Sequence, residues 1–101
     1  MAKFKIVGIS FDHMHMGDLL GMVQNHPDAE IAGLFDPDPA RMARAVVQFG
    51  VPQDRVFTDF DTCMRATKPD LAILCAATGD HAAYTERLAT YGVNEIGRAH
   101  V

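Results

Sequence analysis

One run near the amino end indicates the fold class: Phe4-Lys5-Ile6-Val7-Gly8-Ile9. It is short, apolar and rich in β-branched residues, which is typical of a strand buried on both faces of a parallel sheet. Apolar residues then recur at helical spacing and form one stripe, at Met16, Leu19, Leu20 and Val23. Pro27 ends this helix, because proline cannot continue it. The run therefore predicts the first strand and helix of a β–α–β unit.

The same alternation continues along the chain. We expect further strands at residues 30–35, 55–58 and 71–76, and helices at residues 39–49 and 59–67 and around Tyr84, Leu88 and Tyr91. Asp38 and Pro39 suit a helix start, whereas Gly50 and Gly92 suit helix ends. Strands that alternate with helices require a parallel sheet with right-handed crossovers. The predicted fold class is α/β: a doubly wound, Rossmann-like parallel sheet.

Composition narrows the function classes. The 101 residues carry a net charge of −4, and the nine lysines and arginines are scattered, which argues against binding nucleic acid or an anionic membrane. No apolar run approaches the length of a membrane span. Cys63 and Cys75 form neither a disulfide framework nor a metal-ligand spacing. Because the first expected strand begins too near the amino terminus to leave room for a signal peptide, we expect a cytoplasmic protein.

The loop after the first strand is the first candidate site, because open parallel sheets bind ligands beyond the carboxyl ends of their strands. A dinucleotide fingerprint, G-x-G-x-x-G, beginning at Gly8 has glycines also at positions 10 and 13, where this chain has Ser10 and His13. We expect Gly8 to permit the turn and Ser10 to let the backbone approach a pyrophosphate. Phe11 and Asp12 lie between these positions and are also candidate cofactor-binding residues. An ordinary strand-to-helix turn is the alternative.

Asp36 is the second candidate. It ends the second expected strand, 28 residues after Gly8, where a carboxylate accepts hydrogen bonds from both hydroxyls of an adenosine ribose. The alternative is that Asp36 only starts the turn Asp36-Pro37-Asp38-Pro39. A carboxylate repels a 2′-phosphate, so NAD is favoured over NADP. The preference is mild, because Arg41 lies near enough in sequence to accommodate a phosphate.

Histidines offer further alternatives. His13 and His15, flanked by Asp12 and Asp18, have the chemistry of zinc or iron ligands. Side chains two apart at a helix start diverge, so we expect polar residues lining a loop rather than a metal site. His81 follows the third buried strand and is expected at the same edge of the sheet as the Gly8 loop. It either contacts cofactor or substrate or only occupies the first turn of its helix.

Several loose motifs, taken together in their order and spacing, resemble the amino-terminal NAD(P)-binding domain of the Gfo/Idh/MocA oxidoreductases. The resemblance covers residues 3 to about 94. The motifs that carry it are Lys5-Ile6-Val7-Gly8, Ala32-Gly33-Leu34-Phe35-Asp36-Pro37-Asp38-Pro39-Ala40-Arg41, Val56-Phe57-Thr58-Asp59-Phe60, Lys68-Pro69-Asp70-Leu71-Ala72-Ile73-Leu74, Ala77-Thr78, His81-Ala82 and Tyr91-Gly92-Val93.

The resemblance implies a nicotinamide dinucleotide on the Gly8 loop, with Asp36 at the adenosine ribose. It implies hydride exchange at a carbinol carbon of a sugar, polyol or related small molecule. Thr78 and His81 match the family segment that passes the nicotinamide ribose, and Ala77 is a further candidate cofactor-binding residue.

Three positions depart from the family pattern. Ser10 and His13 replace family glycines, and Gly79 stands where proline is common.

A larger departure follows residue 94. In the family an apolar strand leads into Glu-Lys-Pro, whose lysine assists proton transfer, whereas residues 95–101 match the translation of a sequencing-library adapter. We expect residues 95–101 to be a non-native tail, neither an apolar strand nor a helix, after a partial NAD(P)-binding domain at residues 1–94. The fragment is then inactive, and a full-length parent carries the substrate domain and forms a homo-oligomer. The alternative function is a non-catalytic nucleotide-binding or regulatory module of the same fold.

Overall fold

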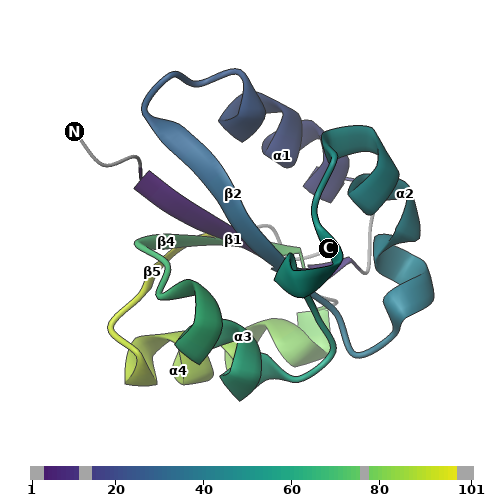
Figure 1. The fold of residues 1–101 in the computed structure, drawn as a ribbon. Helices are drawn as coiled ribbons and strands as arrows, with labels where there is room; N and C mark the ends of the chain where they lie inside the picture. Colours follow the sequence, from purple (N-terminus) through teal and green to yellow (C-terminus); the bar gives the residue numbers. More distant parts are fainter. Residues whose placement is uncertain (1–3, 12–14, 76–77, 98–101) are drawn as a thin grey trace.

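The structure is a computed structural model that describes the backbone of residues 4–11, 15–75 and 78–97. Side chains are described for the same residues except 15–18, 78–79 and 96–97. Five parallel strands form one sheet in the order β3-β2-β1-β4-β5 (Figure 1). The strands are β1 (Phe4–Phe11), β2 (Ala29–Phe35), β3 (Val56–Phe57), β4 (Leu71–Cys75) and β5 (Asn94–Gly97). The helices are α1 (His15–Gln24), α2 (Pro39–Phe49), α3 (Phe60–Thr67) and α4 (Thr78–Thr90), with a short 3-10 turn, η1, at Gln53–Arg55.

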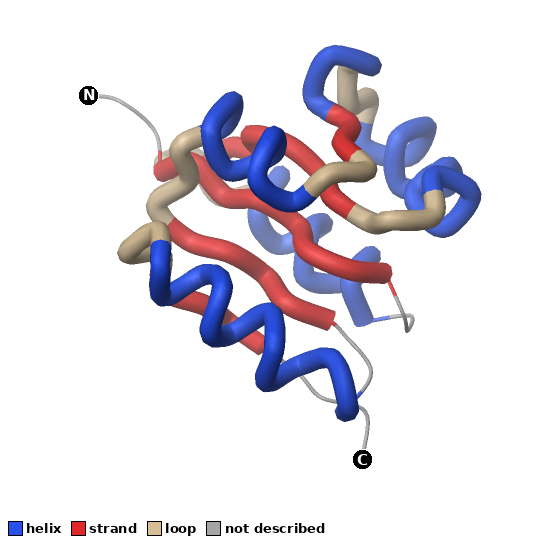
Figure 2. Tube along the Cα trace, turned by 90° about the horizontal axis from the view of Figure 1, so that it is seen from below, coloured by secondary structure: helices blue, strands red, loops and turns tan. Residues whose placement is uncertain are grey.

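The sheet lies between two helical layers (Figures 1 and 2). Successive residues of a strand point to opposite faces, so Ile6 packs with α1 and α2 whereas Val7 and Ile9 pack with α3 and α4. Leu34 and Phe35 divide between the two faces in the same way. Each face thus has its own apolar core, which confirms the doubly wound arrangement.

Strand order reverses beside β1. The chain proceeds outward from β1 through β2 to β3, then crosses the sheet to β4 on the other side of β1 and continues to β5. Connections on the two sides of β1 diverge to opposite faces, and in open α/β sheets ligands bind at such a point, beyond the carboxyl ends of the strands. The fold therefore directs attention to the residues that follow β1, β2 and β4.

Local capping explains where α2 begins and ends. The Asp38 carboxylate accepts a hydrogen bond from the Ala40 N–H at 3.0 Å, and Pro39 occupies the first helical position. Gly50 adopts a left-handed conformation with φ of 63°, and its N–H donates to the Val46 carbonyl. The predicted start and end of this helix are both confirmed.

Gly33 allows α3 to pack closely on β2. A β-carbon added at Gly33 would lie 2.8 Å from Cγ2 of Thr67 and 3.1 Å from both the Arg55 carbonyl oxygen and Cε2 of Phe57. Thr67 is buried, and its hydroxyl donates to the Cys63 carbonyl at 2.7 Å, so it has little room to move. This glycine is needed for space rather than for an unusual backbone conformation.

One expectation about the first strand is wrong. β1 extends to Phe11, so Gly8 lies inside the strand, paired with Leu34 and Ile73, and not at its turn. The strand continues because Ile9 and Phe11 keep pairing with β2 and β4, respectively.

Residues 95–97, expected to form neither an apolar strand nor a helix, belong to β5, where Glu95 pairs with Ala72 and Ile96 with Ile73. Backbone groups make this ladder, so an apolar sequence is not required. Residues 98–101 of the expected tail lie outside the described residues.

The last helix also differs in part from the expectation. Leu88 is buried and Tyr84 half-buried, as the predicted apolar face requires, but α4 ends at Thr90 and Tyr91 is 40% exposed. The Tyr91 hydroxyl donates to Asp61 at 2.6 Å, which raises the pKa of Tyr91. Among the described helices, none has the length and apolar character needed to cross a membrane.

Candidate functional site

Ser10 marks the end of β1 at the point where strand order reverses. It is 2% exposed and has φ of 65°, a left-handed conformation that glycine adopts more easily than serine. The pairing of β1 with β4 shifts between Ile9 and Phe11, so the ladder skips Ser10. The backbone irregularity that a glycine fingerprint would supply is therefore at Ser10, two residues after Gly8.

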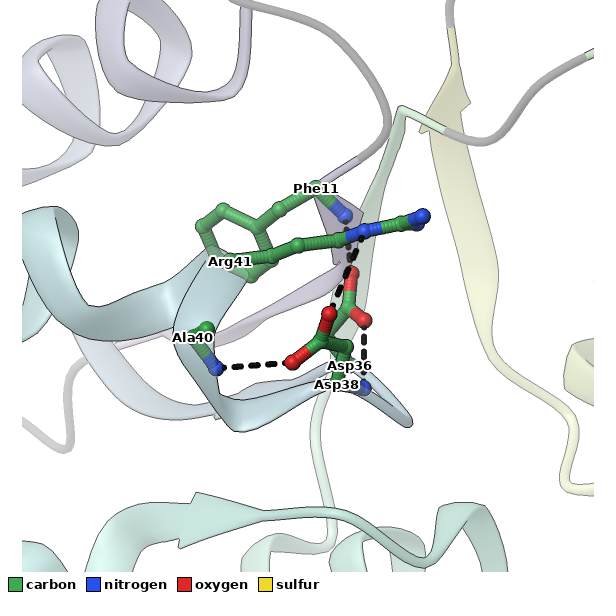
Figure 3. A network of polar contacts seen from close by, with 5 residues as sticks. All are labelled: Phe11, Asp36, Asp38, Ala40 and Arg41. Atoms are coloured by element: carbon green, nitrogen blue, oxygen red, sulfur yellow. Dashed lines mark hydrogen bonds and ion pairs between the residues drawn. The ribbon is translucent and has the colours of Figure 1, made fainter.

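Asp36 directly follows β2 and is fully buried. Its Oδ2 accepts the Phe11 N–H at 2.7 Å, and its Oδ1 accepts the Asp38 N–H at 2.8 Å (Figure 3). The Asp36 N–H in turn donates to the Phe57 carbonyl at 3.2 Å. Asp36 thus joins the ends of three neighbouring strands, β1, β2 and β3.

Asp36 does start the turn that the sequence offers as an alternative role, because its side chain accepts the N–H of Asp38, two residues later. The bond to Phe11 is an additional contact, across 25 residues of sequence. It brings the carboxylate against the segment that follows Gly8. An ionised carboxylate has about four acceptor positions, so two backbone donors leave some for other hydroxyls.

Arg41 lies on the same turn and interacts with Asp38. Its Nε is 4.0 Å from Oδ2 of Asp38, and both side chains are about half exposed. In Figure 3, Arg41 from α2 and Phe11 from β1 lie on the same side of the turn that carries Asp36 and Asp38. The guanidinium is thus close to the predicted ribose site but is paired with a neighbouring carboxylate.

His81 lies in the first turns of α4, after β4. Its Nδ1 is 3.5 Å from the Thr85 hydroxyl, and its Nε2 is buried without a hydrogen-bond partner among the described residues. Thr85 Oγ1 also lies 2.9 Å from the His81 carbonyl oxygen and 2.9 Å from Oε1 of Glu95 in β5. No local sequence pattern singles out Thr85 and Glu95, because only strand pairing places β5 beside α4.

Several candidates cannot be placed. Asp12, His13 and Ala77 lie outside the described residues, as does the side chain of Thr78. The same holds for the side chains of the metal alternative. Within the described part of the chain, no three His, Cys, Asp or Glu side chains are grouped so that they could hold a metal ion.

An apolar hollow of about 480 Å³ lies at the opposite edge of the sheet. Its lining includes Phe4, Ala29 and Leu71, the first residues of β1, β2 and β4, together with Leu19 and Met22 of α1. Ser10 and Asp36 take no part in it, so this hollow is separate from the candidate site at the carboxyl edge.

Comparison with known proteins agrees with this geometry. The sequence model of the Gfo/Idh/MocA group, described as an oxidoreductase family with an NAD-binding Rossmann fold, matches residues 2–96. The chain belongs to this family. A comparison with curated proteins gives no match.

Solved structures share the fold of this Gfo/Idh/MocA domain at low sequence identity. WlbA dehydrogenase from Bordetella pertussis, in complex with NADH and UDP-GlcNAcA, is 18% identical to this chain with a TM-score of 0.81. The match covers 95% of this chain and 27% of the WlbA chain. An Agrobacterium radiobacter oxidoreductase in complex with NAD+, L-tartaric acid and magnesium is 22% identical, with a TM-score of 0.82; the match covers 95% of this chain and 27% of that protein.

Apo scyllo-inositol dehydrogenase from Lactobacillus casei is 19% identical, with a TM-score of 0.78; the match covers 95% of this chain and 28% of that protein. The chain thus spans little more than a quarter of the length of these proteins.

Proposed function

We propose that this domain binds NAD in preference to NADP, as the cofactor-binding part of an oxidoreductase acting on a sugar, polyol or related small molecule. The observation that carries the proposal is the Asp36 carboxylate, bonded at 2.7 Å to the Phe11 N–H beside the point where strand order reverses. In Rossmann domains an acid at this position recognises the hydroxyls of the adenosine ribose.

The described residues fit a dinucleotide. The buried Asp36 carboxylate has acceptor positions beyond the two that bind backbone donors, and the left-handed Ser10 supplies the bend that lets a pyrophosphate approach the end of β1. His81 Nε2, which has no hydrogen-bond partner among the described residues, offers a polar contact for nicotinamide ribose or substrate. When bound, the cofactor supplies the hydride donor or acceptor. The negative charge of Asp36 disfavours a 2′-phosphate, which supports NAD over NADP.

The substrate class is proposed from the relatives. The structures above include a complex with UDP-GlcNAcA and a scyllo-inositol dehydrogenase, so sugars and polyols recur among proteins with this fold. Oxidation of such a substrate removes a hydride from a carbinol carbon and a proton from its hydroxyl.

A proton acceptor must therefore lie near the nicotinamide. The family resemblance assigns this role to a lysine, and of the described lysines, Lys5 and Lys68 both lie at the amino edge of the sheet, near the starts of β1 and β4. We therefore propose that the 101-residue chain binds cofactor without turning over substrate.

Calorimetric titration of the chain with NAD and NADP tests the proposal. We expect NAD to bind more tightly, and Asp36→Ala to abolish binding. Asp28→Ala, which removes the same charge from an exposed position at the amino edge, should retain it. Circular dichroism of each variant separates loss of binding from loss of fold. A folded wild-type chain that binds neither dinucleotide would contradict the proposal.

A further inference from the structure

A polar cluster of His81, Thr85 and Glu95 joins α4 to β5. The Thr85 hydroxyl oxygen is its centre, 2.9 Å from Oε1 of Glu95 and 3.5 Å from Nδ1 of His81. We propose that Thr85 and Glu95 are positioning residues, which hold the ring proton of His81 on Nδ1 so that Nε2 accepts a hydrogen bond from a hydroxyl group of the bound dinucleotide. This inference rests on the proposed function.

Strand pairing places Glu95 beneath α4. Glu95 pairs with Ala72 of β4, and residues paired between parallel strands point to the same face of the sheet. Ala72 belongs to the apolar core that also includes Leu88 of α4. A carboxylate on this face is costly unless it is hydrogen-bonded. The Thr85 hydroxyl provides that bond, so the charge of Glu95 orients the hydroxyl.

The single hydroxyl proton of Thr85 has three oxygen acceptors within reach. These are both carboxylate oxygens of Glu95, at 2.9 and 3.1 Å, and the His81 carbonyl oxygen, at 2.9 Å. A hydrogen bond to an ionised acceptor is roughly twice as strong as one to a neutral acceptor, so the proton is donated to Glu95. The lone pairs of Thr85 Oγ1 then accept the proton on His81 Nδ1.

The site of that proton decides what the other ring nitrogen can do. A neutral histidine carries one ring proton, and the hydrogen bond at one nitrogen sets the tautomer. With the proton on Nδ1, Nε2 is an acceptor; it is buried and has no hydrogen-bond partner within the described part of the chain. His81 lies in the first turns of α4, which follows β4 at the carboxyl edge of the sheet. Dinucleotides bind at this edge, and their ribose hydroxyls are donors that suit such an acceptor.

Long-range proton–nitrogen NMR spectra of the isotope-labelled 101-residue chain show which ring nitrogen carries the proton. At about pH 8 histidines are ordinarily neutral, and the signals of His81 are identified by their loss in His81→Gln. We expect the proton on Nδ1 in the wild type. Thr85→Val, which removes the hydroxyl, should move the proton to Nε2, whereas Thr85→Ser should keep it on Nδ1. Glu95→Gln, which removes the charge that orients the hydroxyl, should give a mixture of both forms.

Titration with NAD connects the tautomer to the cofactor. NAD should shift the Nε2 resonance of the wild type. Thr85→Val should raise the NAD Kd about fivefold, which is equivalent to one neutral hydrogen bond. The matched control is Thr90→Val, which removes a hydroxyl of the same helix that donates to the Glu86 carbonyl at 3.0 Å. It should change neither the His81 tautomer nor the NAD Kd.

The outcomes distinguish this inference from the proposed function. If the wild type binds NAD but His81 carries its proton on Nε2, or if folded Thr85→Val or Glu95→Gln keeps the wild-type tautomer, the inference is wrong. An Nε2 resonance that NAD does not shift would also overturn it, as would an equal change in Thr90→Val. If folded wild type binds neither dinucleotide, the proposed function fails, and the inference fails with it. Circular dichroism confirms that each variant is folded.

Discussion

Asp36→Asn tests whether the buried carboxylate stabilises the fold as well as the cofactor site. The substitution preserves shape, so no cavity forms, but an amide has one oxygen where the carboxylate has two. In the structure both oxygens accept backbone donors, from Phe11 at 2.7 Å and from Asp38 at 2.8 Å. Asparagine can serve only one of them, and its NH₂ group must then face the other N–H.

The expected loss follows from these two contacts. A hydrogen bond to a charged group contributes about 1.5–3 kcal/mol, and a buried donor left without an acceptor costs about 1–3 kcal/mol. Removing the charge of a fully buried carboxylate offsets part of this, because its desolvation penalty disappears. We expect the free energy of unfolding to fall by about 2–3 kcal/mol, a large fraction of the roughly 5–15 kcal/mol typical of a domain.

Urea denaturation followed by circular dichroism measures this difference. With a slope of about 1.5 kcal/mol per molar urea, the midpoint should fall by about 1–2 M. Asp38→Asn is the matched control: it makes the same chemical change two residues away, keeps the N-cap and loses only a half-exposed ion pair, so it should cost less than about 0.5 kcal/mol. If the two variants unfold at the same urea concentration, the carboxylate does not join the strand ends as described.

Three further predictions concern packing, thiol reactivity and pH. Gly33→Ala should destabilise the domain by about 1–3 kcal/mol in urea denaturation through overpacking, whereas Gly21→Ala, whose added carbon would lie 4.0 Å from its nearest neighbour, should be neutral or stabilising. Burial raises the pKa of Cys63 to about 12, so a thiol reagent at pH 8 should modify this cysteine only after unfolding; rapid modification of the folded protein would contradict its burial. Hydrogen bonds from Thr62 lower the pKa of Asp59, so the stability difference between wild type and Asp59→Ala should be full above about pH 4 and decline as the pH falls through the lower folded-state pKa. A difference that stays constant from pH 6 to pH 2 would count against this cap.

Sequence reasoning succeeded where short-range rules decide the structure. Strand alternation and helical spacing depend on neighbouring residues, so the layers and the order of elements followed from the apolar pattern. Capping depends on a few adjacent residues, and the ends of α2 were predicted from Asp38, Pro39 and Gly50. The family resemblance, based on the order of short motifs, was likewise confirmed.

Prediction from the sequence failed where pairing between distant segments decides the structure. Gly8 has the residue type of a turn, but pairing on both sides keeps it inside β1 and places the left-handed bend at Ser10. Residues 95–97 lack a strand-like pattern, yet the backbone of β4 offers them a ladder. Such contacts depend on register and strand order, which no local pattern contains.

Asp36 shows both parts of this division. The sequence by itself determined that an acid follows a buried strand, two residues before a helix cap, because turns and caps are local. Only the tertiary structure decided that this acid is fully buried and bonded to Phe11, because that contact exists only once β1 and β2 pair in register. The same pairing brings Asp36, Asp38 and Arg41 to the end of β1, where a dinucleotide is proposed to bind.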